Sequence, residues 1–183
     1  MKQMSNIKKI AIIGAGWYGC HLANYLKKNR IFVKIFEKNS DIFMGSSGYN
    51  QYRFHKGFHY PRSKSTIQDI KINSKKFLKL YKNFIKFPNN NYYSIAKKKS
   101  LIDFDTYKDI LKINKIKFTK CKKLNFVNYD TIEGVIKCPE GVILNDKLKR
   151  YFKKILKENI VYNTQIKNIQ NLKKNYDLVI DCS

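Results

Sequence analysis

Residues 8–38, KKIAIIGAGWYGCHLANYLKKNRIFVKIFEK, constrain the fold of this chain more than any other segment. The β-branched apolar run at 10–13 is typical of a buried parallel strand, and three glycines follow it in the spacing G-x-G-x-x-G. Apolar residues then recur at helical spacing as far as 27–29, and 31–36 is a second β-branched run. A strand, a glycine turn, a helix and a strand in this order predict a Rossmann-like βαβ unit.

The three glycines have separate physical roles in such a unit. Gly14 lets the chain turn sharply out of the strand, Gly16 leaves room for the pyrophosphate of a dinucleotide, and Gly19 lets the helix pack closely on the strand. The pyrophosphate then lies at the helix N-terminus, which begins here with Trp17 and Tyr18 and offers free N–H groups and a positive dipole end. We therefore predict a dinucleotide site; the alternative is a tight turn that binds no ligand.

An acidic residue ends the second predicted strand. The carboxylate of Glu37 can accept hydrogen bonds from the hydroxyls of an adenosine ribose. Because a carboxylate disfavours a phosphorylated ribose, the sequence favours FAD or NAD over NADP.

The formal charge of +25 raises the question of nucleic-acid binding. Nearly all of this charge comes from lysines spread evenly along the chain, whereas nucleic-acid grooves usually use arginine for bidentate contacts. Lys, Asn, Ile, Tyr and Phe are all abundant and share A/T-rich codons, so base composition explains the excess. We predict no nucleic-acid partner and expect a small-molecule substrate.

The four cysteines lie far apart, without the spacing of a metal site or of a disulfide scaffold. We therefore expect reduced thiols, no bound metal and a cytoplasmic location. The apolar run near the N-terminus is too short for a signal peptide. No run of about 20 apolar residues occurs, so we expect no membrane-spanning segment.

Residues 48–63, GYNQYRFHKGFHYPRS, concentrate reactive side chains. They include two of the three histidines, and aromatic residues stand at nearly every other position. Polar groups that converge on a cofactor cleft are the usual architecture of a site, so we expect this segment to contact cofactor or substrate. The alternative is an extended, aromatic-lined loop whose His and Arg side chains bond local carbonyls.

Residues 45–50, GSSGYN, form a G-x-S-x-x-N loop soon after the strand that ends in an acid. With this loop the sequence resembles the FAD-dependent oxidoreductases of the D-amino-acid oxidase type, in the glutathione-reductase-like flavoprotein superfamily. The resemblance covers the whole chain loosely and is specific over 8–63. It implies an α/β fold with a Rossmann-like FAD-binding domain of the three-layer ββα type (1–84 and 141–183) and an inserted, partly complete α+β substrate domain (85–140).

The same resemblance implies roles for individual residues. Those expected to bind FAD are Gly14, Gly16, Trp17, Tyr18, Gly19, Glu37, Lys38, Ser46, Ser47, Asn50, Arg53 and Ile166. Those expected near the flavin ring are Arg53, His55, Gly57, His59 and Tyr60. His55 or His59 would act as a catalytic base, because histidine titrates near the working pH. Arg53 or Arg62 would bind a substrate carboxylate.

The remaining sequence predicts further helices and strands. Helices are expected at 63–84, 103–114 and 146–157, with Asp103 and Asn145 as N-terminal caps. Strands are expected at 92–97, 160–162, 165–169 and 176–182, and irregular strands between 121 and 138.

Together these features predict a flavoprotein oxidoreductase in which a small amine- or hydroxyl-bearing substrate passes hydride to FAD. Alternatives are another FAD enzyme such as a sugar mutase, an NAD-dependent dehydrogenase, and an inactive truncated nucleotide-binding protein. Members of the family continue past the point that corresponds to Ser183. We therefore expect this chain to correspond to their N-terminal half, with a missing C-terminal half or a complementary chain as its partner.

Overall fold

A computed structural model describes residues 8–183, which form two compact units. The first unit runs to Gln51 and resumes at Asn145–Ser183, and the second is Tyr52–Leu144. The division thus falls earlier than the predicted boundary at residue 84, because residues 52–84 belong to the same compact unit as residues 85–144. The assignment of a cofactor domain and a substrate domain stays a prediction.

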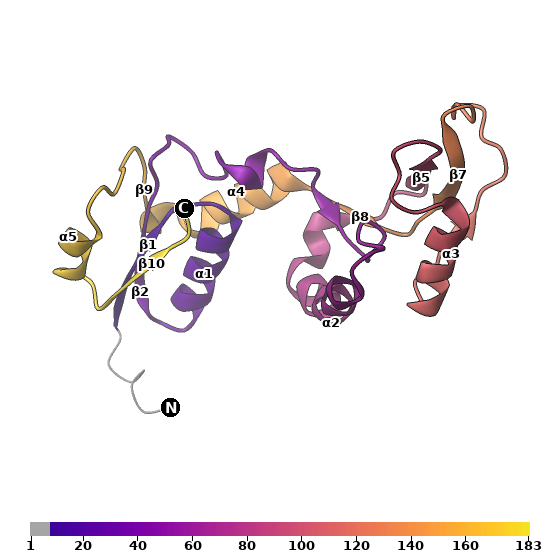
Figure 1. Cartoon of the computed structure of the whole chain (residues 1–183). Helices are drawn as coiled ribbons and strands as arrows, with labels where there is room; N and C mark the ends of the chain where they lie inside the picture. The colour runs from indigo at the N-terminus through magenta and orange to yellow at the C-terminus, as the bar shows by residue number, and fades with distance from the viewer. Residues whose placement is uncertain (1–7) are drawn as a thin grey trace. The chain divides into compact units, whose positions relative to one another are not determined.

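The first unit is built on a four-stranded parallel sheet in the order β10-β1-β2-β9 (Figure 1). Its strands are β1 (Lys9–Ile13), β2 (Phe32–Phe36), β9 (Ile160–Val161) and β10 (Leu178–Asp181). Its helices are α1 (Trp17–Lys28), α4 (Asn145–Ile155) and α5 (Ile169–Lys173), with short 3-10 turns at Ser46–Gly48 and Lys157–Asn159. The predicted βαβ unit is therefore confirmed.

Close packing of α1 on β1 explains why this part of the sequence folds as it does. Ile10, Ala11 and Ile12 of β1 are buried, and the buried residues of α1 lie on one face of the helix. A Cβ atom at Gly19 would lie 2.1 Å from the carbonyl oxygen of Gly14. Only a glycine at position 19 therefore allows the helix to approach the strand this closely.

One predicted strand is wrong. Residues 165–168 have no regular structure, and 169 begins α5 instead of ending a strand. Thr164 N–H donates to the carbonyl of Glu37 at 2.8 Å, and the Asn168 side chain accepts from Gln170 N–H and caps α5. These two interactions hold the chain beside the end of β2 and start a helix, so the alternation of apolar residues does not become a strand.

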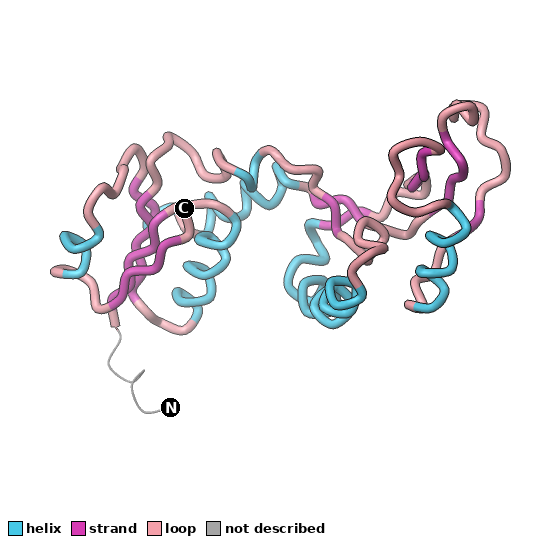
Figure 2. The backbone as a smooth tube through the Cα atoms, in the orientation of Figure 1, coloured by secondary structure: helices cyan, strands magenta, loops and turns pink. Residues whose placement is uncertain are grey.

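The second unit combines helices with two small antiparallel sheets, which Figure 2 shows as separate groups of strands. One sheet has the order β3-β8-β4 (Arg53–Phe54, Gly141–Ile143 and Ile85–Lys86). The other has the order β5-β7-β6 (Tyr92–Ala96, Ile132–Lys137 and Thr119–Lys120). The helices are α2 (Lys64–Tyr81), extended by a 3-10 turn at Lys82–Phe84, and α3 (Phe104–Ile113).

Helix caps and an apolar core fix the second unit. Ser63 accepts from Thr66 N–H at the start of α2, and Asp103 accepts from Thr106 N–H at the start of α3, as predicted for Asp103. The core is formed by Phe58, Ile67, Phe104, Tyr107, Leu111, Ile116, Ile136 and Cys138. Within residues 8–183, no helix is both long enough and apolar enough to cross a membrane.

Candidate dinucleotide site

A pocket of about 480 Å³ opens in the first unit where β1 and β2 end and α1 begins. It is lined by Ile13, Gly14, Gly16, Trp17, Tyr18, Phe36, Glu37, Lys38, Asn39, Met44, Gly45, Ser46, Ser47, Thr164, Gln165, Ile166, Cys182 and Ser183. The carboxyl ends of parallel strands are where α/β sheets bind their ligands. The pocket therefore lies where the sequence predicts a dinucleotide.

The structure brings most of the predicted cofactor residues to this pocket but not all of them. Gly19 lies behind it, against Gly14. Asn50 follows the 3-10 turn, and its side-chain amide donates to the carbonyl of Ser46 at 3.1 Å. Arg53 belongs to β3 of the second unit. The sequence reasoning missed four lining residues: 164, 165, 182 and 183. The last two directly follow β10, and the end of a parallel strand is a signal that could have found them.

The glycine loop has the geometry that close approach of a ligand requires. Gly14 has a φ of +93°, and a Cβ there would lie 3.0 Å from the carbonyl oxygen of Cys182. Gly16 has an ordinary φ of −69°, and a Cβ there would lie 3.3 Å from Ser47 Oγ. Glycine is therefore needed at position 14 for the backbone conformation of the turn. At position 16 the absence of a side chain instead leaves open space next to Ser47 in the pocket.

Glu37 is 6% exposed and ties the glycine loop to the end of β2. Its Oε2 accepts from Ala15 N–H at 2.7 Å, and its Oε1 accepts from Asn39 N–H at 2.9 Å and from the Asn39 amide at 2.7 Å. A carboxylate offers about four lone-pair sites, so these three bonds leave room for a further donor such as a ribose hydroxyl. Asn39 was missed by the sequence reasoning, because an Asn in a loop gives no signal of this contact.

The N-terminus of α1 points into the pocket without an acidic residue in its first turn. Ser47 Oγ accepts from Trp17 N–H at 2.9 Å, so the G-x-S-x-x-N loop meets the glycine loop at the helix start. The helix dipole and the backbone N–H groups favour an anion here, as for the phosphates of a dinucleotide. The serine and glycine loops thus line one pocket, at a position where the helix N-terminus favours an anion.

Two aromatic rings support this corner of the pocket, and a thiol lies under it. The ring of Trp17 stacks on Phe43 with centroids 6.2 Å apart, whereas Tyr18 is 84% exposed.

Cys20 is fully buried, and its thiol donates to the carbonyl of Ala15 at 3.5 Å. Burial, followed by the nearby Glu37, raises the pKa of Cys20 to about 12, so its thiol stays neutral and is not a nucleophile at neutral pH.

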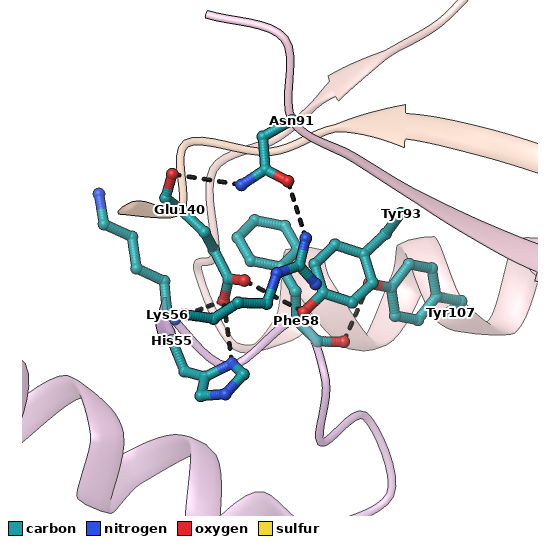
Figure 3. Close-up of polar contacts among 8 residues, drawn as sticks. His55, Lys56, Phe58, Asn91, Tyr93, Tyr107 and Glu140 are labelled. Atoms are coloured by element: carbon teal, nitrogen blue, oxygen red, sulfur yellow. Dashed lines mark hydrogen bonds and ion pairs between the residues drawn. The ribbon is translucent and has the colours of Figure 1, made fainter. Parts of the chain in front are cut away.

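The predicted catalytic residues gather in the second unit around a carboxylate that the sequence reasoning missed. Glu140 is wholly buried, and its Oε1 accepts from Lys56 N–H at 2.6 Å while its Oε2 accepts from the Tyr93 hydroxyl at 3.1 Å (Figure 3). Nδ1 of His55 lies 3.9 Å from Glu140 Oε1. The ring of His59 lies 5.8 Å from that of His55, measured between centroids.

Arg53 belongs to the same cluster and has partners there. Its Nη2 donates to the side-chain oxygen of Asn91 at 2.8 Å, and its guanidinium lies 4.6 Å from the centroid of the Tyr93 ring. The Asn91 amide in turn donates to the carbonyl of Glu140 at 3.3 Å. Figure 3 shows Asn91 and Tyr93, from the start of β5, next to Glu140 from another segment of the chain. Gly57 has a φ of +101°, and a Cβ there would lie 3.0 Å from Ile116 and 3.5 Å from Ile67, so any other residue at this position would be strained.

Burial sets the titration of this cluster. It lowers the pKa of His55, and His59 and Arg53 lower it further, while Glu140 raises it. Burial, followed by Glu140, raises the pKa of Tyr93 well above its ordinary range. At neutral pH the cluster therefore contains an uncharged His55 and a protonated Tyr93. Residues 8–183 contain no group of three or more metal-ligating side chains that could hold an ion.

Comparisons with known proteins agree with this geometry. Residues 12–79 match the family described as "NAD(P)-binding Rossmann-like domain". The chain is 31% identical over 185 residues to FAD-dependent monooxygenase FPY4 of Fusarium mangiferae, covering 97% of this chain and 50% of that protein. It is 48% identical over 73 residues to FAD-dependent monooxygenase kojA of Aspergillus flavus, covering 40% of this chain and 17% of that protein.

Solved structures extend the comparison to the fold of nearly the whole chain. L-alpha-glycerophosphate oxidase from Mycoplasma pneumoniae, solved dithionite-reduced with FAD bound, superposes with a TM-score of 0.64 at 20% identity. The match covers 87% of this chain and 46% of that one. This chain thus spans half of FPY4 and less than half of the oxidase. The predicted α/β class with a Rossmann-like domain is confirmed.

Proposed function

We propose that this chain binds FAD in the first-unit pocket and acts in an FAD-dependent oxidoreductase of the D-amino-acid oxidase type. The observation that carries the proposal is the meeting of three features in one pocket: the α1 N-terminus, the serine loop and the Glu37 carboxylate. The relatives that match in sequence are named as FAD-dependent enzymes, which supports the same cofactor.

The pocket residues fit the two ends of an adenosine diphosphate. We assign the pyrophosphate to Gly16, Trp17, Tyr18, Ser46 and Ser47, where the helix N-terminus attracts anions. We assign the ribose to Glu37 and Lys38, and the adenine to the backbone near Ile166. Asn50 adds to the serine loop through its bond to Ser46.

Bound FAD supplies an acceptor for the hydride of a substrate C–H bond. We propose that the second unit contacts the substrate, a small molecule bearing an amine or a hydroxyl next to that bond. His55 or His59 would accept the substrate proton, since an uncharged histidine is a competent base at neutral pH. Arg53, which contacts Asn91 and Tyr93, would help to keep His55 uncharged by lowering its pKa.

The experiment uses Trp17, which is the only tryptophan in the chain and lines the pocket. Titrating the protein with FAD while exciting Trp17 should quench its emission in a saturable way. A Glu37→Ala variant should bind FAD more weakly than the parent protein. The matched Glu158→Ala variant, at an exposed glutamate of the same unit, should bind FAD as the parent does. Unsaturable quenching, or equal FAD binding by both variants, would contradict the proposal.

One observation favours a second candidate, a nicotinamide dinucleotide, because the matching family is described as NAD(P)-binding. The same titration with NAD⁺ separates the two. Saturable quenching by NAD⁺, with none by FAD, would establish a nicotinamide site in the same pocket.

A further inference from the structure

His55 and Glu140 each lie one residue beyond the paired ends of β3 and β8 in the second unit. In the antiparallel pair β3–β8, Arg53 stands opposite Val142 and Phe54 opposite Gly141. The same register continued by one residue sets position 55 opposite position 140. Directly opposite side chains in antiparallel pairs are close enough to interact. The ends of these two strands therefore bring the pair near each other, and Lys56 N–H donates to the Glu140 carboxylate at 2.6 Å.

The two nitrogens of the His55 ring have different surroundings. Nδ1 is buried, has no hydrogen-bond partner within residues 8–183, and lies 3.9 Å from Glu140 Oε1. The side chain as a whole keeps 30% of its exposure, so its open part lies away from Nδ1. Figure 3 shows the same arrangement, with one ring nitrogen turned to Glu140 and the other turned away.

A buried carboxylate is costly unless it is paired and hydrogen-bonded. Glu140 has one donor on each oxygen, Lys56 N–H and the Tyr93 hydroxyl, and His55 is the nearby group that can add a further proton. A carboxylate next to one ring nitrogen favours the histidine tautomer that carries its proton there. The other nitrogen, Nε2, is then left with a free lone pair.

We propose that Glu140 is a positioning residue: it holds the His55 proton on Nδ1 and so makes Nε2 the proton acceptor of the second unit. The inference rests on the proposed oxidoreductase function for the use of that acceptor. In such a reaction Nε2 would take the substrate proton and bound FAD would supply the acceptor for the hydride, so that the substrate loses two electrons in total. Glu140 takes no proton itself and contacts no reacting atom.

Nuclear magnetic resonance of ¹⁵N-histidine-labelled protein tests the pair without a turnover assay. The chain has three histidines, so His21→Gln and His59→Gln variants assign the His55 signals. In the parent protein above the His55 pKa, the nitrogen shifts should show the proton on Nδ1. A proton on Nε2 would overturn the proposal, and this result needs no variant that must fold.

Variants test whether the carboxylate is the cause. The groups that face the His55 ring are Glu140, His59, Arg53 and Tyr60, and of these only Glu140 raises its pKa. In Glu140→Gln the pKa of His55 should therefore fall below its value in the parent protein. The matched Glu133→Gln variant, at an exposed glutamate of β7, should leave it unchanged. An unchanged His55 pKa in a folded Glu140→Gln protein would overturn the pairing.

One further variant and a cofactor assay separate this inference from the proposed function. Tyr93→Phe removes the donor to Oε2 but keeps the charge, so the His55 proton should stay on Nδ1. FAD retention by the parent protein is measured on the same samples. If the parent protein retains FAD but its nitrogen shifts do not show the His55 proton on Nδ1, this inference alone is overturned. Failure to retain FAD with the tautomer intact would overturn the proposed function, and with it the catalytic use of the pair.

Discussion

Replacing Gly16 with alanine separates ligand binding from folding. Gly16 has a φ of −69° and a ψ of −177°, a backbone conformation that alanine adopts without strain. Its new methyl would lie 3.3 Å from Ser47 Oγ, a contact that a small hydroxyl shift relieves. We therefore expect the unfolding midpoint of Gly16→Ala to stay close to that of the parent protein.

The same methyl occupies the space between the two loops that we assign to the pyrophosphate. Displacing a phosphate oxygen from one backbone N–H loses a charge-assisted hydrogen bond, worth about 1.5–3 kcal/mol. At about 1.4 kcal/mol per factor of ten, FAD affinity should fall roughly 10- to 100-fold. Quenching of Trp17 emission by FAD measures the change, and urea unfolding measures stability in parallel. A folded Gly16→Ala protein that binds FAD as tightly as the parent would refute the assignment of this space to the pyrophosphate.

Three further changes test the fold and the buried thiol. Gly19→Ala forces a methyl to 2.1 Å from the Gly14 carbonyl oxygen, so the urea midpoint should fall by the equivalent of about 3 kcal/mol or more; an unchanged midpoint would contradict the close packing of α1. Asp103→Ala removes the cap of α3 and should cost about 1 kcal/mol in the same assay, with no loss if the cap is unimportant. Because burial raises the pKa of Cys20 from 9.0 to about 12, the folded state disfavours the thiolate, and stability should decline as pH rises from about 9 to 12. Cys20→Ala should flatten that decline, and an equally steep decline in the variant would exclude Cys20 as its cause.

The first unit was predictable because its signals are local in sequence. The glycine spacing, the β-branched runs and the acid at the end of β2 all lie within residues 8–38. Each has a physical role that requires its residue type, as the space at Gly16 and the bonds of Glu37 show. The serine loop was predicted from the resemblance, and its contact with Trp17 explains why a hydroxyl stands at position 47.

The second unit was predicted less well because its contacts join distant segments. Glu140 lies 84 residues from Lys56 in the chain, and between a proline and a glycine it reads as part of a turn. Only the three-dimensional structure reveals that it is buried and lies 3.9 Å from His55. The strand expected at 165–169 failed for a similar reason, since the bond between Thr164 and Glu37 cannot be read from local periodicity.

The most direct test of the central claim is the absorbance spectrum of the purified protein after incubation with FAD and desalting. The account predicts flavin bands that remain with the protein through desalting, at about one flavin per chain if the first-unit pocket is the site. The Gly16→Ala protein should lose those bands under the same treatment. A folded parent protein that emerges without flavin absorbance would contradict the account.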